Sequence, residues 1–157
     1  MSATHLEFTT QISAAPEFVF DLVGDMPKYG RWLPDSPAFG GTVGVTPYPV
    51  RLGTTYLDAP PIKKPGVVTE FDPPHRIGFR HTVQIRQAVS TDVEAAIHYS
   101  FDSRDGGTFV RRELDLTINL RGLRGLLRAL LLQAFRKENV RTLDCLKRYA
   151  ETHAPGR

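Results

Sequence analysis

The chain has 157 residues, of which 41% are hydrophobic and 24% are charged, which is the composition of a globular protein rather than of a disordered or membrane-embedded one. The length suffices for one domain with a substantial core and is too short for two, so we expect a single domain over residues 1–157. Lys and Arg number 20 against 17 Asp and Glu and are spread along most of the chain without a recognition motif, which argues against a nucleic-acid partner.

The sequence shows no sign of targeting or of cofactor chemistry. Its N-terminal residues lack the basic region and apolar stretch of a signal peptide, and the longest nearly apolar run, Leu126 to Phe135, is too short to span a bilayer. Cys145 is the only cysteine, and the five histidines are scattered. We therefore expect a cytoplasmic protein with no metal, no other cofactor and at most peripheral membrane contact.

The first third of the chain predicts one strand and two short helices. Residues 6–12 alternate between apolar and polar, which is typical of a strand with one buried face. Proline suits the first position of a helix, so a helix is expected from Pro16 to Gly24. A second short helix carries Trp32 and ends before Pro34.

The middle of the chain has the pattern of strands and turns. The predicted strands cover residues 39–47, 52–59, 67–71, 77–85, 93–101 and 110–120. A loop is expected over 60–66 because of its Pro and Gly residues, and a hairpin turn at 104–107. Residues 77–85 show the cleanest alternation.

After Gly122 the apolar spacing changes to three and four, which predicts one helix from about Leu123 to Thr152, roughly 45 Å long. Its first half has more leucine than one buried stripe requires. Basic residues flank these leucines: Arg121, Arg124, Arg128, Arg136 and Lys137. We expect this second apolar surface to lie under the short helices or in a homodimer contact, with peripheral membrane contact as the remaining alternative.

These elements together predict an α+β fold. A sheet with one apolar face must cover it, and the long C-terminal helix is the only predicted element large enough to do so. Successive strands pair most simply as an antiparallel meander, giving a curved antiparallel sheet of about seven strands. One helix cannot fill the whole width of such a sheet. We therefore expect a cavity beneath the two short helices, which follow the first strand and close one end.

This order of elements resembles the START-like helix-grip superfamily, and the resemblance covers nearly the whole chain. Four segments match it locally: Ile12–Phe20, Met26–Trp32, Leu52–Tyr56 and Val68–Ile77. Its members include birch-pollen-allergen-like plant proteins, steroid and lipid transfer domains, and bacterial polyketide cyclase/dehydrase-like proteins. The resemblance implies a helix-grip domain whose cavity holds a lipid, sterol or polyketide-like molecule. It implies no particular reaction, because the superfamily has no universal catalytic signature.

Residues on the predicted inward faces are the candidate ligand-binding residues. They are Trp32, Phe79, His81, Ile97, Tyr99, Arg112, Leu114, Leu116 and Asn139. The apolar members would form the wall of the cavity together with Leu6 and Phe8 of the first strand. Trp32 is either part of a lid over the cavity or ordinary core packing of its helix.

The polar candidates each have two interpretations. His81 is either a core histidine bonded to a neighbour or a ligand contact, and Tyr99 either orients a ligand oxygen or sends its hydroxyl to the rim. Arg112 either holds a ligand carboxylate or enolate, or lies at an edge with its head group in water. Asn139 ties the helix to the sheet, or reaches the cavity; the tie is the favoured interpretation.

The sequence has no glycine-rich phosphate loop, no zinc-protease helix motif and no nucleophile elbow, so no catalytic residue is assigned. Binding or transport of a hydrophobic small molecule is the leading hypothesis. The alternative is a polyketide aromatase/cyclase or dehydratase, in which His81 or Tyr99 exchanges protons and Arg112 stabilises an enolate oxygen. A third hypothesis is an interaction module that binds a protein partner.

Overall fold

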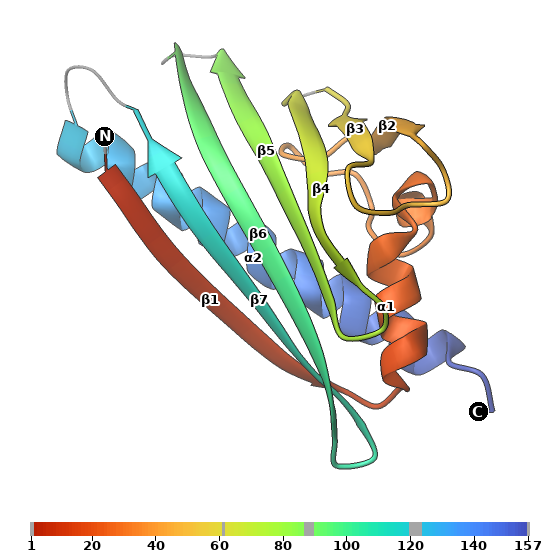
Figure 1. The fold of residues 1–157 in the computed structure, drawn as a ribbon. Helices are drawn as coiled ribbons and strands as arrows, with labels where there is room; N and C mark the ends of the chain where they lie inside the picture. Colours follow the sequence, from red (N-terminus) through yellow and green to blue (C-terminus); the bar gives the residue numbers. More distant parts are fainter. Residues whose placement is uncertain (1, 61, 87–89, 120–123, 157) are drawn as a thin grey trace.

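The computed structural model describes residues 2–60, 62–86, 90–119 and 124–156, and Figure 1 shows how its elements are arranged. The elements are β1 (Ser2–Ile12), α1 (Pro16–Gly24), the 3₁₀ helix η1 (Met26–Arg31), β2 (Thr42–Thr46), β3 (Thr55–Asp58), β4 (Lys64–Asp72), β5 (Arg76–Arg86), β6 (Ser90–Arg104), β7 (Gly107–Ile118) and α2 (Arg124–His153). This is the predicted order of one strand, two short helices, six strands and a long helix, so the predicted α+β helix-grip fold is confirmed.

The strands form one antiparallel sheet in the order β1-β7-β6-β5-β4-β3-β2. The last six strands follow one another as a meander, and β1 pairs with β7 at the far edge. This register places Arg112 of β7 directly opposite Phe8 of β1 on one side and Tyr99 of β6 on the other. The arginine therefore lies among aromatic side chains on the inner face of the sheet.

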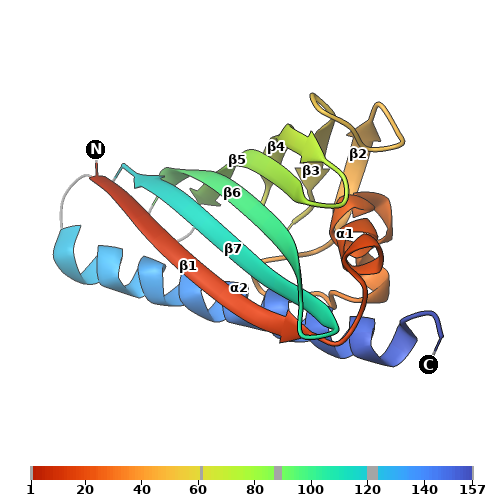
Figure 2. The same ribbon diagram turned by 60° about the horizontal axis from the view of Figure 1, so that its bottom comes forward.

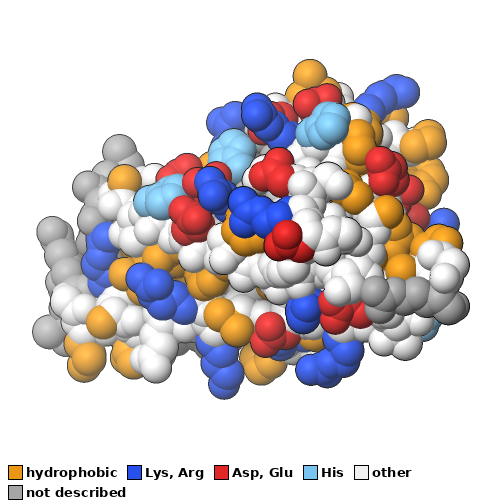
Figure 3. Space-filling model, turned by 90° about the horizontal axis from the view of Figure 1, so that it is seen from below, with side chains coloured by type: hydrophobic (Ala, Val, Ile, Leu, Met, Phe, Trp, Pro, Cys, Tyr) orange, Lys and Arg blue, Asp and Glu red, His pale blue; other side chains and the backbone are white. Residues whose placement is uncertain are grey.

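The helix α2 lies along the concave face of the sheet, and α1 and η1 close the end beside the C-terminal half of α2 (Figure 2). Alternate residues of β6, the odd-numbered ones from 91 to 101, are buried, which is the period-two pattern of a half-buried strand. The opposite, convex face carries histidines and charged side chains of both signs (Figure 3). The sheet thus has one apolar and one polar face, as the sequence predicts.

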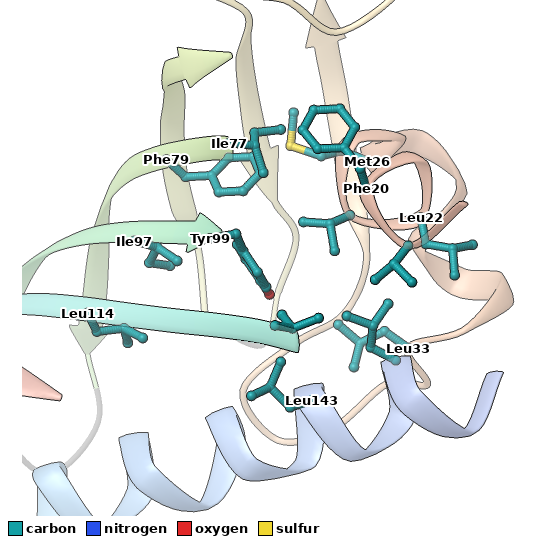
Figure 4. Close-up of a cluster of buried hydrophobic side chains, with 14 of the residues drawn as sticks. Phe20, Leu22, Met26, Leu33, Ile77, Phe79, Ile97, Tyr99, Leu114 and Leu143 are labelled. Carbon is teal, nitrogen blue, oxygen red and sulfur yellow. The ribbon is translucent and has the colours of Figure 1, made fainter. Parts of the chain in front are cut away.

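The hydrophobic core fills the space between the sheet, α1 and the C-terminal half of α2 (Figure 4). Phe20 of α1 packs edge-on against Phe101 of β6, with the ring centroids 5.5 Å apart. Leu143 and Leu146 supply the facing side of α2 and are buried. Packing at this end leaves the unfilled volume farther along the sheet, toward the first half of α2.

One predicted loop is wrong in part. Residues 60–66 were expected to be irregular, but β4 begins at Lys64 and pairs with β3 through Pro65 and Gly66. A β-carbon at Gly66 would lie only 2.4 Å from Cζ of Tyr56, so glycine is required here for the Tyr56 ring to cross the neighbouring strand. The Pro and Gly residues that indicate a loop in sequence instead accommodate an aromatic side chain at the cavity.

The leucine-rich start of α2 does not lie under the short helices, which was one of its expected positions. Leu126 and Leu130 are 74% and 53% exposed, so they are not buried under the short helices. The short helices and the loop after them contact the other half of α2, where Arg141 donates a hydrogen bond to the carbonyl oxygen of Pro34. Hydrophobic and basic side chains are both exposed along the lower edge of the molecule in Figure 3. The homodimer contact stays a prediction.

Within the described ranges, no helix is both long enough and apolar enough to cross a membrane.

Candidate ligand cavity

A cavity of about 190 Å³ lies between the concave face of the sheet, the η1 region and the middle of α2. Eight of the nine predicted residues line it: Trp32, Phe79, His81, Ile97, Tyr99, Arg112, Leu114 and Asn139. They come from the η1 region, β5, β6, β7 and α2, so the fold brings together residues that are more than 100 positions apart in the sequence. Most of the remaining wall is apolar, as in typical small-molecule sites.

The ninth predicted residue, Leu116, does not line the cavity although it is fully buried. Leu6 and Phe8 of β1, which were expected in the wall, do not line it either. The helix α2 packs against β1, so this edge of the sheet is covered by the helix and forms core instead of an open wall. Sequence alternation identifies the inner face of a strand but does not show how far along it the helix lies.

Aromatic side chains from the η1 region close the cavity at one end. The Trp32 indole donates a hydrogen bond of 3.0 Å from Nε1 to the carbonyl oxygen of Leu22, and the Tyr29 hydroxyl donates to that of Val23. The Tyr29 and Trp32 rings meet edge to face, with centroids 5.1 Å apart. Both polar groups are thus bound to the end of α1, and the apolar parts of the rings face the cavity. Trp32 is at once core packing of its segment and part of the cavity wall.

His81 of β5 is bonded to a neighbouring side chain, because its Nδ1 lies 3.1 Å from the Tyr56 hydroxyl of β3. Burial, and then the positive charges of Lys64 and Arg112, lower the pKa of His81 to about 3. The imidazole is therefore neutral at pH 7. The other ring nitrogen, Nε2, makes no hydrogen bond within the described residues, and His81 lines the cavity.

A depressed histidine pKa has a measurable effect on stability. The unfolded chain binds a proton at His81 below about pH 6.5 and the folded chain does not, so folding loses stability as the pH falls below 6.5. Between pH 7 and pH 5 this amounts to about 2 kcal/mol for one such group. Between pH 7 and pH 5, the free energy of unfolding of His81→Gln, measured in urea, should therefore fall by about 2 kcal/mol less than that of the wild type. An equal loss in both proteins would contradict the assignment.

Arg112 of β7 contacts two other polar side chains of the cavity wall. Its Nε donates a hydrogen bond of 2.6 Å to Oδ1 of Asn139 on α2, and its Nη1 donates to the Tyr99 hydroxyl. The guanidinium also lies over the Tyr99 ring, 4.8 Å from the centroid. In Figure 4 the Tyr99 side chain projects from β6 toward α2 with its oxygen at the tip. The Arg112 head group is half-buried and held by the Asn139 and Tyr99 side chains.

Asn139 is the tie between helix and sheet that the sequence analysis favoured, and it also lines the cavity. Its Oδ1 accepts from Arg112, and its Nδ2 donates to the carbonyl oxygen of Phe135, 2.7 Å away on the preceding turn of α2. Both ends of the amide are therefore bonded, which fixes the direction of the guanidinium. Burial raises the pKa of Tyr99, so its hydroxyl stays protonated near neutral pH.

Sequence reasoning missed a buried ion pair in the wall. Asp58 of β3 and Lys64 of β4 are cross-strand partners, and Lys64 Nζ lies 3.7 Å from Asp58 Oδ2. Their side chains are only 11% and 12% exposed. Asp58 also accepts 2.7 Å from Thr42 Oγ1, and Lys64 donates 2.6 Å to the carbonyl oxygen of Ala38. Burial raises the pKa of Asp58 and lowers that of Lys64, so burial opposes both charges.

One signal for this pair was present in the sequence. Asp58 follows Tyr56 at a spacing of two, which places both on one face of a strand. Lys64 had no such signal, because it lies in a segment rich in proline and glycine that was predicted to be a loop.

Metal-binding side chains converge on the convex face of the sheet and not in the cavity. Ligand atoms of His5, Glu7 and Glu113 lie within 4.8 Å of one another, and all three side chains are at least partly exposed. His5 Nδ1 lies 2.7 Å from Asp115 Oδ1, and this hydrogen bond raises the pKa of His5. The expectation that the protein binds no metal stays a prediction.

Solved structures similar to this chain show the fold. An uncharacterised protein from Rhizobium leguminosarum has a TM-score of 0.71 at 18% sequence identity, covering 97% of this chain and 98% of the other. Ara h 8.0201 has a TM-score of 0.71 at 9% identity, over 97% and 100%. The di-domain ARO/CYC protein BexL from the BE-7585A biosynthetic pathway has a TM-score of 0.70 at 20% identity, over 95% of this chain and 50% of BexL.

Comparison with curated protein sequences finds no match. A family model described as polyketide cyclase/dehydrase and lipid transport matches residues 3–151, which is almost all of the sequence. The chain therefore belongs to the polyketide cyclase/dehydrase and lipid transport family, within the START-like helix-grip superfamily that its sequence resembles.

Proposed function

We propose that this protein binds a hydrophobic small molecule, lipid, sterol or polyketide-like, inside the cavity between the sheet and α2. The observation that carries the proposal is the cavity itself, an unfilled volume of about 190 Å³ with a mainly apolar wall and a few polar groups. Such a wall favours transfer of an apolar molecule out of water, and the polar groups orient it. The family description, which includes lipid transport, supports the same function.

The alternative is a polyketide aromatase/cyclase, favoured by the description of two structural neighbours, BexL and StfQ, as di-domain ARO/CYC proteins. The polar groups of this cavity fit that alternative less well. A general base works best when its pKa is close to the working pH, and the pKa of His81 is about 3. Tyr99 stays protonated and can donate but not accept a proton. Only the Asp58–Lys64 pair has one pKa raised and the other lowered, toward neutral pH.

A thermal-shift panel tests the binding function. A ligand present at 100 times its Kd should stabilise the folded protein by about 2.7 kcal/mol. For a chain of this size that corresponds to a rise in Tm of roughly 5–10 °C. Fatty acids, sterols and bicyclic aromatic compounds form a suitable panel. If no member of any class raises Tm, binding of a hydrophobic ligand is refuted.

The enzyme alternative has its own assay. On a model poly-β-ketone, the wild type should produce cyclised product, and His81→Ala and Arg112→Ala should each lower the rate at least tenfold if those residues act in turnover. If the wild-type rate equals that of the uncatalysed reaction and the panel shows ligand binding, the enzyme alternative is refuted and the carrier function is supported. Rates that both substitutions leave unchanged would remove this mechanism.

A further inference from the structure

The Arg112 side chain is half-buried, and its hydrogen-bond partners are neutral. Its Nε and Nη1 donate to the Asn139 amide oxygen and the Tyr99 hydroxyl, and the flat face of the group lies on the Tyr99 ring. Within the described parts of the chain, no carboxylate oxygen lies within 4.0 Å of it. A partly buried cation is stabilised by a negatively charged group beside it, and the direct contacts of Arg112 do not include one.

The carboxylates that line the same cavity already have partners. Asp58 pairs with Lys64, and Glu138 lies 2.7 Å from Arg141 and accepts from Ser36. The two acidic side chains of the wall are thus each matched by one basic side chain. Arg141 does not line the cavity, so the wall itself holds two acidic and two basic side chains, and Arg112 is the basic one that forms no ion pair among the described residues.

Two hydrogen-bond donors of this cluster have no protein acceptor. Arg112 Nη2 makes no hydrogen bond within the described residues, and no fully buried side-chain nitrogen or oxygen there lacks a partner, so Nη2 must reach open space. The Tyr99 oxygen accepts from Nη1, and its own hydrogen has no acceptor among the described residues. Both groups line the cavity, and they are adjacent because β6 and β7 pair Tyr99 with Arg112.

We propose that the ligand of this cavity is an amphipathic acid, an apolar molecule with one carboxylate that accepts hydrogen bonds from Arg112 Nη2 and the Tyr99 hydroxyl. The inference rests on the proposed binding function and specifies its ligand class. A carboxylate has two acceptor oxygens and one negative charge, which match two adjacent donors and one cation that forms no ion pair among the described residues. Asn139 acts as the positioning residue, because its amide holds the guanidinium toward the cavity.

The test uses two ligands of the same shape, 2-naphthoic acid, which is ionised at pH 7.4, and its neutral amide, 2-naphthamide. Calorimetry should show that the wild type binds naphthoate at least tenfold more tightly than naphthamide. Arg112→Met keeps an apolar stem and removes the charge, and it should abolish this preference while changing the affinity for naphthamide less than threefold. Tyr99→Phe removes one oxygen, and it should lower the affinity for naphthoate without changing the affinity for naphthamide. This variant tests the same claim if Arg112→Met does not fold.

Arg111→Met is the matched control, because Arg111 is the next residue of β7 and lies on the convex face, paired with Glu7. It should change neither affinity. Equal binding of naphthoate and naphthamide by the wild type would overturn the proposed ligand class and leave cavity binding intact. A preference for naphthoate that persists in both Arg112→Met and Tyr99→Phe would overturn it as well. Failure of both ligands and of the whole thermal-shift panel would refute the binding function and this inference together.

Discussion

Replacing Lys64 with Met should lower the free energy of unfolding by about 3–5 kcal/mol, because it leaves the buried Asp58 carboxylate without its cation. The two side chains are about one-tenth exposed, and water cannot replace the lost partner. Thr42 supplies one hydrogen bond of 2.7 Å to the carboxylate, which compensates only part of the charge. Urea unfolding of the wild type and of Lys64→Met measures the difference directly.

The second variant and the control separate charge from packing. Lys64→Met combined with Asp58→Asn removes both charges and keeps an acceptor for Thr42, so most of the lost stability should return. The exposed pair Arg111–Glu7, with side chains 46% and 45% exposed, is the comparison, and Arg111→Met should cost no more than about 1 kcal/mol. Equal costs for Lys64→Met and Arg111→Met would show that the buried pair has no special role.

Replacing Ala95 with Phe should lower the affinity for any cavity ligand at least tenfold while leaving the protein folded. Ala95 lies on β6 between His81 of β5 and Leu116 of β7, is 1% exposed and lines the cavity. A phenyl ring at this position would occupy much of the 190 Å³ that a ligand needs. Because the ring enters existing space, it should cost less stability than a similar enlargement in a filled core, which typically costs 1–3 kcal/mol.

Ala150→Leu is the control for this prediction. Ala150 of α2 is fully buried and does not line the cavity. Its enlargement should destabilise the protein and leave the affinity of the folded fraction unchanged. Calorimetric titration and urea unfolding of both variants give the two quantities. Undiminished ligand affinity in Ala95→Phe would place the ligand outside the cavity.

The order of the elements was predictable because it depends on local patterns. The period-two alternation of residues 77–85 and 93–101 predicts strands that pair in the structure with Ile97 opposite Phe79. The spacing of three and four after Gly122 predicts a long helix. The cavity was expected because one helix cannot fill the width of the sheet, and the resemblance to the helix-grip superfamily added the class of molecule that it holds. Six of the eight candidate residues that line it lie on strands, where alternation distinguishes the two faces.

The features that were not predicted from the sequence depend on contacts between segments that are distant along the chain. Lys64 lies beside Asp58 because β3 and β4 pair, with Gly66 leaving room for the Tyr56 ring, whereas the proline and glycine of that segment predict a loop. Leu126 and Leu130 are exposed because the short helices pack at the other end of α2. Periodicity shows which face of a helix is apolar and not what covers that face. Likewise, the partners of Arg112 could not be read from its position in a strand.

The most direct test of cavity binding is the position of a bound ligand seen by isotope-filtered nuclear Overhauser spectroscopy. With 2-naphthoic acid bound to ¹³C-labelled protein, ring protons should show effects to the methyl groups of Ala95, Ile97 and Leu114, which line the cavity. Leu126 and Leu130, exposed on the outside of α2, are the internal comparison. Effects to the three cavity methyl groups and none to the two leucines are the predicted result. Effects confined to Leu126 and Leu130 would contradict the account.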